Sequence, residues 1–539
     1  MKKLNIIIPI VTGLLLAAAC RPDFLEREAT DAIPEENVFE NPALMQLFVN
    51  NMYLDIPSFE FGLYDNITDE SRSYWGGGPL NVVQGQWFAD NNPMEYWPYA
   101  AIRKANMFLS RVDESPVSDE EKTILIGQVK FLRAMQYFNM IQRYGGVPLI
   151  TEPQDLTDDL FVKRATIDES FAFVVKELEE AADLLPDSYG SPSVDVGKAN
   201  RYSAKALLGR VYLFWASPLY NPTREVTRWE KAAEINKEVI DANVYQLHDD
   251  FRRIMLDKNN EEEVFSVQYL KPFREHGWDS WAMPDSRSKQ SAVARSPLQE
   301  FVDAFEMKNG KGIDEEGSGY DPENPYIDRD PRFDATLIVN GSTFGFQGLP
   351  VYMYVGAPID GINLPYATIT GYLMRKGTDE SNQDYYGDAG SDQNWPELRF
   401  AEVLLNYAEA KNEALGAPDQ SVYDAVERIR QRAGLDPYQL PEGLDKAAMR
   451  EKIRHERYIE LAFEQKRYWD LRRWEIAVET LHGKTFHAMY ITRHGDGSYT
   501  YEAKPATQGP YVFQEKMYFM PIPQREIEKN PNLEQNPDW

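Results

Sequence analysis

Two stretches of this chain combine flat aromatic rings with polar side chains in segments rich in turn residues. A sugar presents an apolar C–H face and a rim of hydroxyls, so its site needs rings for stacking with Asp, Asn, Gln or Arg beside them. Residues 73–87 include three consecutive glycines that free the backbone. Residues 273–295 show neither helical nor strand periodicity. The side chains that we predict to contact a ligand are Tyr74, Trp75, Gln84, Trp87, Trp278, Asp279, Trp281 and Arg287.

Burial in the core is the competing interpretation for Trp75 and Trp87, because large aromatic side chains are usually mostly buried. A third, weaker candidate is the segment Tyr352-Met353-Tyr354, whose alternation is more simply accounted for by a strand. Packing within or between helices is the simpler interpretation for the tryptophans of predicted helices, Trp215, Trp229, Trp469 and Trp474.

Catalytic motifs are absent from the sequence. It contains no H-E-x-x-H, G-x-S-x-G or phosphate-binding glycine loop, and its six histidines are scattered. Adjacent carboxylates such as Asp158-Asp159 suit glycoside hydrolysis, but such pairs arise by chance among 86 acidic residues. The oxygen-rich stretch 384–392 lacks the spacing of a calcium-binding loop, so we expect a solvated loop there. We therefore predict a non-enzymatic protein with no catalytic residues, no cofactor and no metal site.

The one cysteine, Cys20, ends an N-terminal leader. Two lysines precede an apolar stretch from Ile6 to Leu16, and Ala17–Ala19 supply the small residues of a cleavage site. The apolar stretch is shorter than the roughly 20 residues of a transmembrane helix. The segment resembles a bacterial lipoprotein box, with alanine in place of the more usual leucine. We expect residues 1–19 to be removed as a signal peptide and Cys20 to carry a lipid anchor; an ordinary signal peptide is the alternative.

Composition argues against a nucleic-acid partner. The formal net charge is −29, which repels phosphate backbones, and removal of the leader with its two lysines makes it more negative. With 43% hydrophobic residues, the chain can bury a large core. Its one cysteine is assigned to the lipid, so we expect no internal disulfide and stability that depends on packing. We find no Gly/Ser-rich or Pro-rich linker, so we predict one unit over 20–539.

Helical periodicity dominates the first part of this unit, about 34–245. The spacing of apolar residues predicts helices ending before Gly145-Gly146, over 167–185, over about 202–216 and over about 229–242. Within the third of these helices, Leu208-Gly209-Arg210-Val211-Tyr212 fits the L-G-x-x-Y part of a tetratricopeptide repeat, although no clean 34-residue period is present. The glycine is expected to let a neighbouring helix approach closely.

The pattern then changes to short apolar runs separated by Gly, Pro, Asn and Asp over about 246–396, which predicts loops and short strands. The strands expected are 264–269, 335–339 and 351–355. Helices resume over about 397–539, at 397–415, 422–433 and 446–478. We predict a mainly α fold in which tetratricopeptide-like helix pairs support a loop-rich ligand-binding part with a few short strands.

Several segments, in the expected order, resemble the SusD/RagB family. They are FLRAMQYFNMIQRYGGVPLI (131–150), RDPRF (329–333), FAEVLLNYAEAKNEALG (400–416), ERIRQRAGL (427–435), RHERYIELAFEQKRYWDLRRW (454–474) and MPIPQREIEKNPNLEQNPDW (520–539). The resemblance implies a lipid-anchored protein on the surface of the outer membrane that captures an oligosaccharide and delivers it to a SusC-like TonB-dependent transporter. In that family the ligand commonly lies on an aromatic arc from an early and a mid-chain loop, which is where our two stretches fall.

The residues that carry the resemblance are predicted to be structural. We expect Ile459, Ala462 and Phe463 to face the core, and we expect ion pairs between helices from Arg454, Glu456, Arg457 and Glu460. Two alternatives to a sugar cargo stay open. Some relatives handle peptides, and the 86 acidic residues suit cationic ones. A helical scaffold that contacts only protein partners is the other.

Overall fold

The computed structural model describes residues 35–539, apart from 60–62, 75, 191–194, 288–293 and 507. The predicted signal peptide and Cys20 therefore lie outside the described residues, as does Trp75. Within the described part of the chain, no helix is both long enough and apolar enough to span a lipid bilayer.

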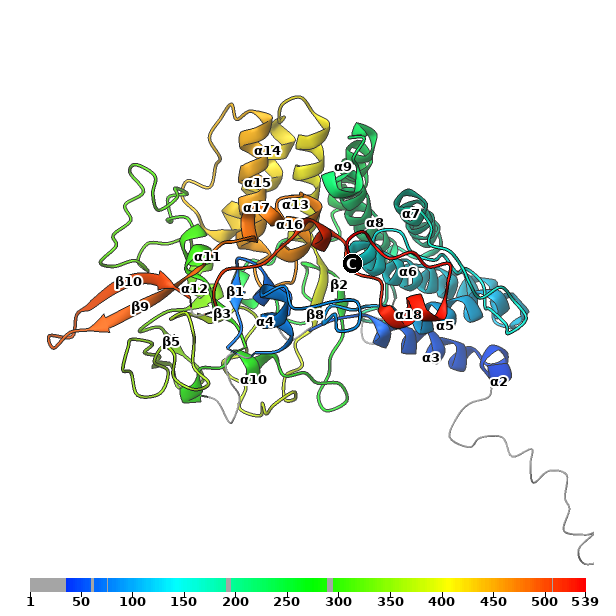
Figure 1. The fold of residues 1–539 in the computed structure, drawn as a ribbon. Coiled ribbons are helices and arrows are strands. Elements are labelled where there is room, and N and C mark those ends of the chain that lie inside the picture. The colour runs from blue at the N-terminus through cyan, green and yellow to red at the C-terminus, as the bar shows by residue number, and fades with distance from the viewer. Residues whose placement is uncertain (1–34, 60–62, 75, 191–194, 288–293, 507) are drawn as a thin grey trace, which may run out of the picture.

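Helices fill one side of the molecule (Figure 1). The consecutive helices α6, α7, α8 and α9 each pack against the next one in the chain, as repeat-like helical hairpins do. Their ends have local causes: Thr166 and Glu169 form a capping box at the start of α7, and Gly145, with φ of 74°, ends α6. The bounds are α2 Glu35–Glu40, α3 Pro42–Met52, α4 Gly78–Val83, α5 Tyr99–Arg111, α6 Asp119–Tyr144, α7 Ile167–Leu184, α8 Arg201–Ala216 and α9 Val226–Asp241.

Gly209 of the L-G-x-x-Y segment lies where α8 and α9 meet. A Cβ atom at this position would lie 2.6 Å from the side-chain nitrogen of Asn236 on α9. Asn236 is fully buried, so the amide has no room to move away. The predicted close helix approach at Gly209 is confirmed.

Among the C-terminal helices, α13 packs against α8 and α9, and α14 and α15 pack against α13. The bounds are α13 Phe400–Ala414, α14 Gln420–Ala433, α15 Lys446–Glu460, α16 Arg467–Arg473, α17 Ala477–Leu481 and α18 Gln524–Lys529. The prediction of one helix over 446–478 is wrong. Phe463 and Gln465 both have φ of 59°, in the left-handed region, and break the helix. The turn lets Glu464 reach Arg399 at 2.7 Å. The helix therefore ends where a contact with a distant segment forms, and the spacing of apolar residues does not predict such a contact.

The remaining region holds short helices and antiparallel strand pairs, β1–β3, β2–β8, β4–β7, β5–β6 and β9–β10. The strands are β1 Ser71–Arg72, β2 Glu263–Val267, β3 Ser296–Pro297, β4 Leu337–Ile338, β5 Thr343–Phe344, β6 Leu349–Pro350, β7 Leu373–Met374, β8 Trp395–Arg399, β9 His487–Arg493 and β10 Tyr499–Pro505. The helices are α10 Trp278–Ala282, α11 Gln299–Ala304 and α12 Arg332–Thr336. The β9–β10 hairpin, which we did not predict, projects from the body (Figure 1).

Residues 351–355 form no strand, which corrects our expectation. The burial alternates as a strand would have it, with Val351 and Met353 buried and Tyr352 exposed. The backbone partners are irregular, however: the Met353 amide donates to the Asn340 side chain, and the Val355 amide donates to the carbonyl of Ile491. The alternation of residue types in this segment therefore reflects alternating burial of the side chains and not the hydrogen-bond ladder of a strand.

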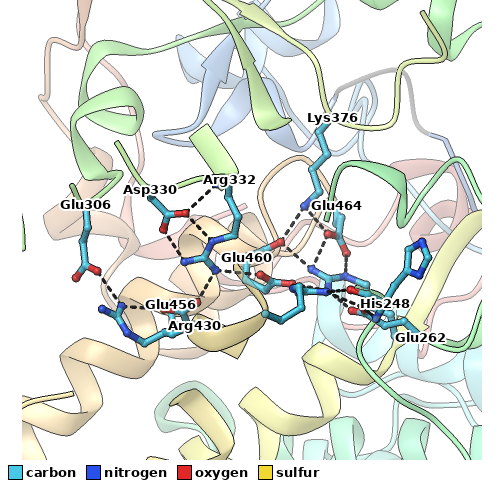
Figure 2. Close-up of polar contacts among 12 residues, drawn as sticks. His248, Glu262, Glu306, Asp330, Arg332, Lys376, Arg430, Glu456, Glu460 and Glu464 are labelled. Atoms are coloured by element: carbon cyan, nitrogen blue, oxygen red, sulfur yellow. Dashed lines mark hydrogen bonds and ion pairs between the residues drawn. The ribbon is translucent and has the colours of Figure 1, made fainter. Parts of the chain in front are cut away.

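A buried ion-pair cluster ties the C-terminal helices to the loop-rich region (Figure 2). Glu456, Glu460 and Glu464 lie four residues apart and carry three of its carboxylates from α15 and the turn after it. Glu262, Glu306 and Asp330 add three more. Their partners come from four other segments, and these are Arg332, Lys376, Arg399, Arg430 and Arg432.

Glu460 lies at the centre of this cluster. Its carboxylate accepts from Arg399 at 2.7 Å and from Arg332 at 3.0 Å, and it also pairs with Arg432. Burial raises the pKa of the Glu460 carboxyl, but the surrounding cations outweigh burial and lower that pKa far below its usual range. The predicted ion pairs to other elements are confirmed for Glu456, Arg457 and Glu460. Arg454 instead pairs with Glu451 of its own helix, which corrects our expectation for that residue. Ile459, Ala462 and Phe463 face the core as expected.

Candidate functional site

The two predicted ligand-binding stretches meet through the β1–β3 pair. Arg72 pairs with Ser296 in antiparallel register, so the chain leaving β1 toward Tyr74 and the chain entering β3 from Ala294 lie at the same end of the pair. These strands lie side by side in Figure 1, although more than 200 residues separate them. The pair therefore places the early and mid-chain loops beside each other.

Tyr74 has an aromatic neighbour that our prediction missed. Its ring centre lies 6.1 Å from that of Tyr366, and the two planes are tilted by 42°. Tyr366 is 50% exposed and has φ of 67°, a left-handed conformation that is uncommon for a tyrosine. The Gln508 side chain donates to the carbonyl of Ser73 at 2.7 Å and so holds the backbone next to Tyr74. No sequence signal connects residue 366 with residue 74.

Trp281 adds a third ring on the mid-chain side. Its indole Nε1 donates to Asp388 Oδ1 at 2.9 Å, and its carbonyl accepts from the Ala294 amide at 2.9 Å. The side chain is partly exposed, and Asp388 is exposed. Trp281 therefore lies at the surface with a fixed ring orientation, on the segment that runs into β3. We call the Tyr74–Tyr366 pair, together with Trp281 on the mid-chain segment that the β1–β3 pair brings alongside, the aromatic site.

Arg287 binds the protein itself. Its Nη2 lies 3.2 Å from the carbonyl oxygen of Leu349 and 3.4 Å from that of Pro350, both in β6. The hydroxyl of Tyr385 donates to the Arg287 carbonyl. Arg287 thus ties the turn after α10 to the β5–β6 hairpin, and only part of its guanidinium can serve a ligand. The contact with a ligand stays a prediction for Arg287 and also for Gln84, which is exposed at the end of α4.

Trp87 and Trp278 are buried, which corrects our expectation that their rings lie at the surface. Trp87 is 2% exposed, and its ring centre lies 4.6 Å from that of Trp539. Trp278 is 3% exposed, lies under the guanidinium of Arg295 at 4.2 Å and donates its Nε1 to the carbonyl of Lys376. Neither ring has a face open to a sugar. Both are core residues, as large aromatics usually are.

Asp279 is also buried, so it is not a surface residue that reads hydroxyls. Its carboxylate accepts from the Gln393 side chain at 2.6 Å, from the Asn382 side chain at 2.7 Å and from the Asp379 amide at 2.8 Å. Burial raises the pKa of the Asp279 carboxyl to about 6, although these hydrogen bonds favour its charged form. Asp279 therefore holds the 379–393 segment against α10.

This arrangement suits binding by stacking and hydrogen bonding. Three rings at the surface can stack on apolar ligand faces, with the Asp388 carboxylate nearby as an acceptor for hydroxyls. Within the described part of the chain, no three His, Cys, Asp or Glu side chains are grouped so that they could hold a metal ion.

Comparison with known proteins connects the whole chain to one family. The family model described as "SusD family" matches residues 240–539, and the one described as "Starch-binding associating with outer membrane" matches residues 23–213. SusD-like protein P2 of Formosa agariphila is 25% identical, with 99% of each chain covered.

Two crystal structures from Bacteroides fragilis share the fold. A SusD-like protein is 29% identical with a TM-score of 0.80, covering 95% of this chain and 100% of that one. A SusD-like carbohydrate-binding protein is 26% identical with a TM-score of 0.79, covering 92% and 100%. The mainly α fold with a loop-rich region is therefore that of these proteins.

Proposed function

The chain belongs to the SusD family, and we propose that it captures oligosaccharides at the aromatic site formed by Tyr74, Trp281 and Tyr366. The observation that supports this site is the β1–β3 pair, which gathers the early and mid-chain loops and leaves aromatic rings at their surface. The carbohydrate-binding relative described above supports the class of ligand.

Binding proceeds by stacking and needs no chemical step. The rings cover the C–H face of a sugar unit, and the carboxylate of Asp388 accepts hydrogen bonds from its hydroxyls. Because Trp281 and Tyr74 are held by contacts to Asp388 and through Ser73, little ordering is needed when the ligand arrives. An open surface buries little ligand area, so we expect micromolar to millimolar affinity, about −8 to −4 kcal/mol.

We further propose that a lipid on Cys20 anchors the protein on the outer membrane, where it delivers its ligand to a TonB-dependent transporter. The family description of outer-membrane association supports this location. Several acyl chains provide durable attachment, at about 0.8 kcal/mol per buried methylene, where one chain does not. Mass spectrometry of the mature N-terminus in wild type and in Cys20→Ala tests the anchor. Co-purification of a barrel protein with the wild type tests the partner.

Calorimetry against a panel of neutral oligosaccharides tests the ligand site. We expect at least one glycan to bind and Trp281→Ala or Tyr366→Ala to weaken it about tenfold. Phe161→Ala is the matched control, because Phe161 is an exposed aromatic residue outside all the candidate ligand-binding stretches. Binding that is unchanged in both site variants would rule the aromatic site out. A response to peptide mixtures with none to glycans would instead favour a peptide cargo.

A further inference from the structure

A cavity that shares no residue with the aromatic site lies among the helices. Its volume is about 530 Å³, and it lies between the start of α9 and the helices α13, α15 and α16. Trp229 of α9 and Trp474, which follows α16, both line it. Its size falls within the range of small-molecule sites, about 300–1,000 Å³.

Arg454 is an incompletely satisfied cation of this cavity. Its guanidinium lies over the ring of Trp474 at 4.8 Å, and the Trp474 indole is itself held by a 2.7 Å hydrogen bond to Glu409. Arg454 Nη1 donates to Glu451 at 3.1 Å, but the Glu451 side chain is 69% exposed, so the pair is weak. The buried Nε has no hydrogen-bond partner among the described residues. The oriented, partly desolvated guanidinium therefore has one weak ion pair and one N–H without an acceptor.

The carboxylates deep in the cavity are already engaged. Both oxygens of Glu409 accept from Arg473, at 2.5 and 2.7 Å, and both oxygens of Glu413 accept from Arg450 at the same two distances. None of these four groups is left to balance Arg454, whose ion pair among the described residues is the one with the exposed Glu451.

The rim of the cavity carries both signs. Arg224 and Glu475 line it and are exposed, and neither side chain has an ion-pair partner among the described residues. An anion must lie away from Glu475, whereas a hydroxyl can donate to it. The ring of Trp229 is partly exposed and offers an apolar face. A ligand that combines a carboxylate, several hydroxyls and an apolar ring face satisfies all of these groups.

We propose that this cavity binds an acidic saccharide unit, a uronic acid, with its carboxylate on Arg454 and its ring against Trp229. The guanidinium supplies the charge-assisted hydrogen bonds that a carboxylate accepts most strongly. The site is separate from the aromatic site and lets one molecule hold a second, charged part of a glycan. Long-range attraction does not help, because the chain carries a net charge of −29, so recognition depends on short-range contacts.

Calorimetry with trigalacturonate and with the neutral trisaccharide galactotriose tests the proposal on the mature protein. Trigalacturonate is expected to bind at least about tenfold more tightly than galactotriose, and Arg454→Gln should weaken it roughly 10- to 100-fold. Trp229→Ala provides a second test if Arg454→Gln does not fold, and it should weaken binding about tenfold. Arg493→Gln, which removes an exposed arginine on β9, is the matched control and should bind as the wild type does.

Two further measurements distinguish the cavity from the aromatic site and from a peptide-binding site. In a Trp281→Ala protein, trigalacturonate binding should persist, so failure of the aromatic site and failure of the cavity are distinguishable. An acetylated dipeptide with a free C-terminal carboxylate is compared with its amidated form. Equal binding of the two trisaccharides, loss of trigalacturonate binding only in Trp281→Ala, or binding of the free peptide without binding of trigalacturonate would each overturn the proposal.

Discussion

The buried ion-pair cluster places charged side chains in the interior, whereas the aromatic site places aromatic side chains at the surface. Each is the opposite of where that residue type usually lies. In the cluster around Glu460, charged side chains are 0–5% exposed and neutralise one another across five segments of the chain. In the aromatic site, Tyr366 is 50% exposed. Buried charged side chains need ion-pair partners to offset the cost of their desolvation. Removal of one partner therefore lowers the unfolding free energy of the protein. Rings at the surface contribute little to folding and are available to a ligand. We therefore expect mutations in the two regions to affect different measurements.

Removal of a central carboxylate should have the largest effect. Glu460→Ala leaves Arg332, Arg399 and Arg432 buried without their shared partner, and breaking a buried pair costs about 3–5 kcal/mol of unfolding free energy. Urea unfolding followed by circular dichroism measures the change. Glu451→Ala on the same helix, with a 69% exposed side chain, is the control and should change stability by less than about 0.5 kcal/mol. A loss below about 1 kcal/mol for Glu460→Ala would show that the cluster contributes no more than surface pairs do.

The short helix α10 holds one buried tryptophan, Trp278, and one partly exposed tryptophan, Trp281, so the same substitution can be compared at both. Trp278→Ala removes a 3% exposed ring that contacts Arg295 and the ring of Phe59, and such truncations cost about 3–5 kcal/mol. The unfolding free energy should fall by this amount, while glycan affinity measured well below the melting temperature should stay within about threefold. A large loss of affinity in a folded Trp278→Ala protein would contradict the assignment of Trp278 to the core.

Trp281→Ala, three residues further on, should give the opposite pattern. We expect it to weaken glycan binding about tenfold, or about 1.4 kcal/mol, and to lower the unfolding free energy by less than about 1 kcal/mol. Calorimetry and thermal unfolding of the same preparations measure both quantities. If Trp281→Ala destabilises the protein as much as Trp278→Ala does, the exposed ring is structural and the contrast between the two positions fails.

The smallest expected effect is a change in pH dependence. Burial raises the folded-state pKa of Asp279 to about 6, above its unfolded value of 3.8, so folding takes up a proton between these values. The stability that this group contributes is fully present below about pH 3.8 and is lost as pH rises through 6, by about 1 kcal/mol between pH 5 and 7.

Thermal unfolding at pH 5, 6 and 7 measures this dependence in wild type and in Asp279→Asn. The variant cannot ionise at this position, so its stability should fall less over the interval. Parallel pH profiles for the two proteins would show that Asp279 does not titrate in this range.

Local patterns predicted the helical part of the molecule well. Apolar spacing placed α7 within one residue of its observed end, and Gly145 stopped α6, because caps and periodicity act within a few residues. The segment 454–463 was also predictable, since its buried and charged positions follow helical spacing. The break after Glu460 was not, because the left-handed Phe463 and Gln465 are held by contacts to distant segments.

The candidate site was predictable by region but not by residue. The two loops were found from composition, yet only the β1–β3 register brings them together. Trp278 and Trp281 have the same residue type and the same local surroundings, and which of them faces solvent depends on Arg295, Phe59 and Lys376 packing over one side of α10. Tyr366 lies beside Tyr74 only because the loop that carries it folds back to that position, which no local pattern predicts.

By itself, the sequence determined the helical class, the family, the acidic charge and the repeat-like helix pairs. These depend on composition and on interactions between residues a few positions apart. Only the tertiary structure decided which aromatic rings are exposed, which carboxylates are neutralised inside and where the cavities lie. Burial and pairing are set by segments hundreds of residues away, so no local pattern contains them.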